Sequence, residues 1–431
     1  MLYKFNVHKS QPYNLKYTSN HPVVNGLVDK LWAELPLDKT KMVDLKKECL
    51  VNTLINLNKG YYNCKYVRYS RRKNNYAELP IRYKPEYYTY NIMTGIMDGL
   101  ESLGLIKSLP GFMNLNDNTK LQTAICVSDG FFKELQPIKN YMVKNVCPKE
   151  PIILKSRQDK MKIDYKDTIF TKKMRRDLDL YNELRQKTKF TMSALTSDLL
   201  NLNSDYFNQF SLTELRPETT TVELSNPFVY RVFSGSFRSG GRFYNGLESN
   251  ASKDLRSRIL INGNPTVEKD FSCMHINMLY NKENQSLKED AYNKLSGGDP
   301  KLRQLFKLIG LVSINSENLK KCFSALRYEI YDNGLKSYFE DLTDNSISRY
   351  YDQWVQAHPV IAKYLSSDVG IKLQYQDSRI AAGIINYFTE KGVPVLVVHD
   401  SFIIEKKYES ELVDKMKSVY KGIFKFEPNV K

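Results

Sequence analysis

The chain has 431 residues, 42% of them hydrophobic, which suits roughly two or three domains with buried cores. This composition excludes a low-complexity disordered chain, a collagen-like fibre and a disulfide-stapled mini-protein. Lysine and arginine total 64 against 48 acidic residues, a formal net charge of +16. Such a surplus favours nucleic acid as the partner, although an AT-rich genome, which enriches a protein in lysine, is an alternative explanation.

The cysteines and the opening sequence indicate a soluble intracellular protein. None of the six cysteines forms a C-x-x-C pair, so neither a zinc ribbon nor a disulfide framework is expected. The opening sequence MLYKFNVHKSQPYN lacks the apolar core of a signal peptide. No segment approaches the roughly 20 apolar residues of a membrane span, so we expect no membrane partner.

The N-terminal half shows two apolar patterns at helical spacing, over residues 41–58 and 88–106. Residues 59–87 between them are rich in Tyr, Lys and Arg and predict an exposed basic loop or hairpin. Residues 107–127 predict a turn, a polar loop and a short strand. Helix and hairpin together resemble a winged helix–turn–helix, with the helix in the major groove and the wing on phosphates. An ordinary α+β fragment is the alternative.

The composition changes along the chain predict three parts. Residues 1–140 form a helical, basic, winged-helix-like domain. Residues 141–215 carry prolines, many lysines and a charged helical pattern, which indicates a linker and a helical segment. From about residue 217 short strands alternate with helices, so residues 216–431 are expected to form an α+β domain.

Two aspartates stand at predicted strand ends in the C-terminal part. Residues 265–280 (PTVEKDFSCMHINMLY) predict a strand that ends at Asp270 and then a helix. Residues 393–405 (VPVLVVHDSFIIE) predict a hairpin whose tip presents Asp400. Phosphoryl transfer in polymerases uses two Mg²⁺ ions about 4 Å apart, and Mg²⁺ prefers carboxylate oxygens. One such aspartate is more often a turn former, so the pair carries the prediction.

Two further segments suit contacts with phosphates. Residues 301–315 predict a helix with Arg303 and Lys307 one turn apart, which can hold a triphosphate, although a solvated helix face is the commoner explanation. Around residue 240 a Gly-Gly turn permits close approach of the backbone, and Arg242 with the following aromatic residues suits a nucleic-acid contact.

The segments GGRFYNG, TVEKDFSCMHINMLY, R-x-x-x-K and VPVLVVHDSFII occur in this order. Together they resemble the palm and fingers of family A DNA polymerases and of single-subunit phage-type RNA polymerases. The sequence looks closest to their relatives in transposons, virophages and plasmids, the transposon–virus polymerase (TV-Pol) group. The resemblance covers about residues 235–410. It implies an α+β fold with a right-hand palm and reduced fingers over 216–431, after a mostly helical N-terminal half with a thumb-like segment over 141–215.

The resemblance implies a role for residues of each motif. Asp270, the carbonyl of Phe271 and Asp400 resemble the ligands of two Mg²⁺ or Mn²⁺ ions. Arg303 and Lys307 resemble the pair on the triphosphate, with Lys307 also the general acid to pyrophosphate.

Other matched positions imply contacts with the primer–template. Arg242, beside Gly241 and Tyr244, resembles the arginine that touches the duplex. His399 would lie near the primer terminus. Gln374, in the helix before the hairpin, would contact the template minor groove. The apolar spacing of residues 371–390 predicts this helix, and Asp377 and Ser378 are expected near its start as capping or polar-face residues.

Three positions depart from the family A pattern. Leu311 and Asn315 stand where family A has an aromatic residue and a tyrosine near the nucleotide. His275 stands at the sugar-gate glutamate, where its bulk would block a 2′-hydroxyl and favour deoxynucleotides. The motif HDS, rather than HDE, is however the RNA-polymerase form.

The implied function is a template-directed nucleotidyltransferase, a DNA polymerase of a mobile element, plasmid or virus, which extends a primer 3′ end. The alternatives are an RNA polymerase or primase with the same site, a template-independent terminal transferase, and a replication-initiator DNA-binding protein with an inactive palm. The expected partners are a primer–template, nucleoside triphosphates and a helicase or other replication proteins. The expected location is the host cytoplasm or a viral replication site.

Overall fold

The computed structural model describes residues 10–63, 66–111, 122–139, 142–146, 148–194, 220–224, 228–287 and 289–431. The chain divides into two compact units. Unit 1 comprises Met1–Ile153, Met161–Arg175 and Phe190–Tyr230, and unit 2 comprises Leu154–Lys160, Arg176–Lys189 and Arg231–Lys431. Residues 141–215 therefore form no part of their own, which differs from the three-part prediction, because their helix α6 (Ile169–Lys187) is shared between the units.

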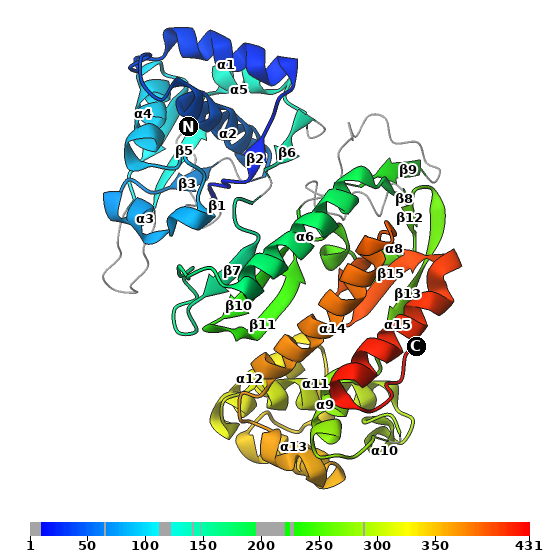
Figure 1. Cartoon of the computed structure of the whole chain (residues 1–431). Helices are drawn as coiled ribbons and strands as arrows, with labels where there is room; N and C mark the ends of the chain where they lie inside the picture. Colours follow the sequence, from blue (N-terminus) through cyan, green and yellow to red (C-terminus); the bar gives the residue numbers. More distant parts are fainter. Residues whose placement is uncertain are drawn as a thin grey trace. The chain divides into compact units, whose positions relative to one another are not determined.

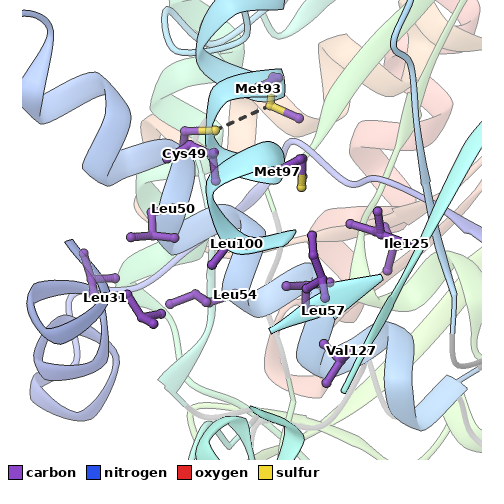
Figure 2. Close-up of a cluster of buried hydrophobic side chains, with 14 of the residues drawn as sticks. Leu31, Cys49, Leu50, Leu54, Leu57, Met93, Met97, Leu100, Ile125 and Val127 are labelled. Carbon is purple, nitrogen blue, oxygen red and sulfur yellow. Dashed lines mark hydrogen bonds between the residues drawn. The ribbon is translucent and has the colours of Figure 1, made fainter. Parts of the chain in front are cut away.

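Unit 1 is built on helices that pack around a small sheet of strand order β1-β3-β5-β4. Its apolar core draws side chains from α1, α2, α4 and β5, and Cys49 lies 3.5 Å from the sulfur of Met93 (Figure 2). The elements are α1 Pro22–Glu34, α2 Val43–Asn63, α3 Lys73–Glu78, α4 Tyr90–Ser102, α5 Asp129–Leu135, β1 Gln11–Pro12, β3 Val67–Tyr69, β4 Ile106–Leu109 and β5 Thr123–Val127. Two short pairs complete it, β2 (Tyr17–Thr18) with β6 (Lys144–Asn145) and β8 (Phe190–Ala194) with β9 (Thr220–Glu223).

The predicted loop over 59–87 is wrong in part, because it contains β3, whose Val67 and Tyr69 are buried in the core. β4 and β5 pair antiparallel after α4, as a winged helix requires, but the predicted wing tip over 112–121 lies outside the described residues. α4 is buried on most sides, and its exposed Asp98 is 2.5 Å from Arg71. α4 contains no lysine or arginine that could contact DNA phosphates, and its predicted DNA-reading role stays a prediction.

Unit 2 contains an antiparallel run of four strands in the order β14-β15-β13-β12. These are β12 Ile259–Ile261, β13 Asn264–Asp270, β14 Leu396–Val398 and β15 Ser401–Glu405. α15 (Glu409–Phe424) packs on β13 and β15, and α14 (Gly370–Glu390) packs on α15 and on α9 (Met274–Lys282) (Figure 1). The predicted strand and helix over 265–280 and the predicted hairpin over 393–405 are thus confirmed.

A second group of helices in unit 2 lies at the end away from these strands, and α14 runs between the two groups (Figure 1). They are α10 Asn293–Ser296, α11 Pro300–Asn315, α12 Leu319–Asp332 and α13 Asp344–Ala357. Trp354 of α13 is fully buried, and a Cβ on Gly310 of α11 would lie 2.8 Å from its ring, so the glycine permits this close helix contact. Within the described ranges, no helix has both the length and the apolar character to cross a membrane.

A buried ion pair ties α6 to the hairpin. Arg185 and Glu248 are 0% and 1% exposed, and their side chains approach to 3.2 Å. Glu248 also accepts a hydrogen bond from the backbone N–H of Val397 in β14 at 3.3 Å, and the Tyr181 hydroxyl donates to the carbonyl of Val395 at 2.7 Å. The strand that leads to Asp400 is therefore held by buried polar contacts.

Glu248→Gln should destabilise unit 2 strongly, because it leaves the buried guanidinium of Arg185 without its counter-charge. We expect the free energy of unfolding to fall by about 3–5 kcal/mol. The measurement is urea denaturation followed by Trp354 fluorescence in a Trp32→Phe background. Glu183→Gln, in the exposed Glu183–Lys187 pair, is the control and should change little. An equal effect of the two substitutions would contradict this role of the buried pair.

Candidate active site

The fold brings Asp270 and Asp400 together at adjacent strand ends. β13 pairs with β15 so that Asp270 lies opposite Ser401. His399 and Asp400 form the two-residue turn between β14 and β15, and His399 has the left-handed backbone (φ 59°) that such tight turns use. The N–H of Phe271 donates to the carbonyl of Asp400 at 3.3 Å, which joins the end of β13 to the hairpin tip.

The charge of Asp270 is only partly compensated. Desolvation by the surrounding protein, together with the negative charges of Asp400 and Glu268, raises the pKa of Asp270 to about 6. The positive charges of Lys253 and Lys307 act in the opposite direction. A carboxylate whose pKa is raised by burial and by a second carboxylate beside it forms a site whose charge a cation would offset.

Glu268 lies on the same face of β13 as Asp270, two residues earlier, yet its charge is paired. The guanidinium of Arg256 binds both carboxylate oxygens at 2.8 and 3.1 Å, and the Ser401 hydroxyl also donates to Glu268. Although desolvation opposes them, these hydrogen bonds hold the pKa of Glu268 below its usual value. Arg256 thus fixes α8 (Lys253–Arg256) along this face. Lys253, one helical turn before Arg256, is a cation that sequence reasoning missed.

The residues present fit a magnesium or manganese site made of oxygen ligands. No cluster of three or more His, Cys, Asp or Glu side chains with the spacing of a metal site occurs in the described part of the chain. Mg²⁺ is usually bound in phosphoryl-transfer sites by one or two carboxylates plus waters and substrate phosphates, so it does not need such a cluster. Asp270, Asp400 and the Phe271 carbonyl would supply the protein's share of the ligands.

α11 begins at Pro300 because Asp299 caps it, its carboxylate accepting from the N–H groups of Lys301 and Leu302. Lys307 is exposed, and its positive charge acts to lower the pKa of Asp270. Arg303, the expected second triphosphate cation, instead donates to Asp290 at 2.6 Å and to Asn293 at 2.9 Å. The structure therefore places the charge of Lys307 within electrostatic range of Asp270, whereas Arg303 has an acidic partner.

The two other predicted nucleotide positions on α11 differ in their surroundings. Leu311 is 53% exposed and lies one turn after Lys307. Asn315 donates to the carbonyl of Leu311 at 2.8 Å, and its side chain occupies the space that a Cβ on Gly370 would need. Asn315 therefore packs α11 against the start of α14, and its predicted nucleotide contact stays a prediction.

A buried aspartate that sequence reasoning misjudged organises the other side of the site. Asp377 is 1% exposed, and its carboxylate accepts from Arg242 at 2.5 and 2.9 Å and contacts His275 Nε2 at 2.9 Å. We expected Asp377 and Ser378 to be capping or polar-face residues near the start of their helix. That is wrong, because α14 begins at Gly370 and Asp377 lies one turn after the buried Leu373, on the apolar face.

The predicted Gly-Gly turn is wrong, because both glycines lie inside β11 (Ser236–Tyr244), where they permit the strand to pack on α14. Gly241 is buried with φ +89°, and a Cβ there would lie 2.5 Å from Phe233 and 2.9 Å from the hydroxyl of Ser378. The buried Arg231 donates to the Gly241 carbonyl at 2.8 Å. Gly241 therefore makes a close contact within the protein, and its predicted nucleic-acid contact stays a prediction.

The other residues that are predicted to contact nucleic acid are Tyr244, Gln374 and His399. Tyr244 is 37% exposed, and Gln374 is half-buried on α14. Partial desolvation lowers the pKa of His399, and the nearby guanidinium of Arg242 lowers it further. His399 is therefore neutral at physiological pH, in a form that can donate or accept a hydrogen bond.

Comparison with known proteins adds no identity: no protein-family model matches the chain, and no curated protein is similar to it in sequence.

Asp270→Asn should stabilise the metal-free protein at high pH. Because the folded chain holds the pKa of Asp270 at about 6, against an ordinary 3.8, ionisation of this carboxyl reduces stability. That loss is absent below about pH 4 and complete well above the folded pKa. In EDTA we expect the variant to unfold about 2 °C or more above the wild type at about pH 8, and at the same temperature near pH 4.

Glu268→Gln is the matched control, and its effect should have the opposite sign, because the pKa of Glu268 is lowered in the folded chain. A gain for Asp270→Asn that is equal at both pH values would show that ionisation of Asp270 is not its cause.

Proposed function

We propose that the chain is a metal-dependent, template-directed nucleotidyltransferase, a DNA polymerase of a mobile element, plasmid or virus. The observation that carries the proposal is the placement of Asp270 beside Asp400 at adjacent strand ends, with the charge of Lys307 acting on Asp270. Two divalent ions supply the chemistry when bound: they activate the primer 3′-hydroxyl and neutralise the triphosphate.

The chain's own residues would bind and orient the reactants. Asp270 and Asp400 hold the cations, and Lys307, exposed on α11, approaches the triphosphate and gives a proton to the leaving pyrophosphate. The net charge of +16 would hold the nucleic-acid backbone, so binding should weaken steeply with added salt.

His275 favours the deoxynucleotide form of this activity. Its imidazole is fixed by Asp377, and it lies five residues after Asp270 in the first turn of α9. An imidazole held in this way can exclude a 2′-hydroxyl by its bulk. An RNA polymerase or primase with the same carboxylates would need space at this position.

Asp400→Asn should abolish template-directed extension of a labelled primer in Mg²⁺. Loss of a metal ion that contributes several kcal/mol predicts a rate lower by roughly a thousandfold or more. Separate lanes with dNTPs and NTPs assign the sugar, and a lane without template tests for terminal transfer. Asp332→Asn, at the exposed end of α12, is the matched control and should extend like the wild type.

Wild-type protein that extends no primer with either nucleotide set would contradict the proposal. Combined with tight duplex binding, that result would favour the replication initiator with an inactive palm.

His275→Ala should relax the choice of sugar while leaving dNTP use largely intact. Removing a contact that blocks the 2′-hydroxyl should raise the ratio of kcat/KM for NTP to that for dNTP by about tenfold or more. Single-nucleotide incorporation with each sugar measures the ratio. An unchanged ratio would show that another group selects the sugar.

A further inference from the structure

We propose that residues 429–431 form a positioning segment for the metal site: their backbone pairing with residues 270–272 aims the Phe271 carbonyl at the side of Asp400 and completes the oxygen ligands. The inference rests on the proposed function only in taking a divalent cation as the ligand.

Three backbone hydrogen bonds join the segment to the end of β13. The N–H of Lys431 donates to the carbonyl of Asp270 at 2.9 Å, and the N–H of Asp270 donates to the carbonyl of Lys431 at 3.2 Å. The N–H of Ser272 donates to the carbonyl of Asn429 at 2.9 Å, and Phe271 pairs antiparallel with Val430. Residues 270–272 thus have the segment on one side and the hairpin tip on the other.

The peptide group between Phe271 and Ser272 carries the carbonyl that would bind a cation. In a trans peptide the carbonyl and the following N–H point in opposite directions, and the described residues contain no cis bond. Because the Ser272 N–H points to Asn429, the Phe271 carbonyl points away from the segment. Asp400 lies on that side, since the N–H of Phe271 donates to its carbonyl. The carbonyl therefore lies on the same side of the strand as the hairpin tip.

This peptide lies where neither regular strand nor helix bonding holds it. β13 ends at Asp270, α9 begins at Met274, and Cys273 between them has a left-handed backbone (φ 48°). The segment itself is anchored by the buried Pro428, and the buried Phe271 ring packs beside Phe402 and Tyr420. The positioning segment therefore restrains the peptide between Phe271 and Ser272, which the turn at Cys273 does not.

The test compares Lys431→Pro with Lys431→Ala in the full chain. Both variants lose the ammonium group, but only proline loses the N–H that donates to Asp270. Mn²⁺ binding is measured by electron paramagnetic resonance without nucleotide or nucleic acid, beside a variant that lacks residues 429–431. We expect Lys431→Ala to bind like the wild type, and the proline variant and the deletion to bind roughly 10- to 100-fold more weakly.

Thermal unfolding of each variant in EDTA separates positioning from general stability. Equal Mn²⁺ affinity in the alanine and proline variants would overturn the proposal, as would a wild type that binds no Mn²⁺. If the deletion does not fold, the two substitutions still decide. If these affinities differ as expected but the wild type extends no primer, the positioning segment stands and the polymerase proposal fails.

Discussion

The placement of Asp270 beside Asp400, at the adjacent ends of β13 and β15, is the constraint around which the rest of the site is arranged. Antiparallel pairing of β13 with β15 forces the two carboxylates to adjacent strand ends, and the pKa of Asp270 rises to about 6 as a result of its desolvated position and this neighbour. Isolated carboxylates would avoid this arrangement, and only a rigid scaffold can maintain it. The buried pair of Arg185 and Glu248 gives the hairpin that rigidity.

The charges around this pair are balanced by protein partners, whereas the pair itself is not. Arg256 neutralises Glu268, and Asp377 is bound by both Arg242 and His275. Lys253 and Lys307 act on Asp270 without forming an ion pair with it. A carboxylate pair that lacks a counter-charge, beside carboxylates that have one, is arranged to accept a cation. Sites of this kind reduce the stability of the fold in return for function.

The sequence predicted those elements whose apolar periodicity is strong, namely the strand and helix around Asp270, the hairpin around Asp400 and the helix α14. It could not supply the register that sets Asp270 opposite Ser401, because pairing between strands so far apart in the sequence leaves no local pattern. Asp377 was misjudged although its spacing from Leu373 puts it on the apolar face of α14. Residues 429–431 act through backbone groups, which no residue type reveals, and β3 was hidden in a segment rich in tyrosine and arginine.

The most direct test of the account is a structure of the protein with a primer–template, a non-hydrolysable deoxynucleoside triphosphate and Mn²⁺, with the anomalous scattering of the metal used to locate it. We predict two metal peaks about 4 Å apart, both in contact with Asp270 and Asp400, with the triphosphate on one of them and the primer 3′ end on the other. Metal and nucleotide bound away from these two aspartates, with the carboxylate pair unchanged, would contradict the account.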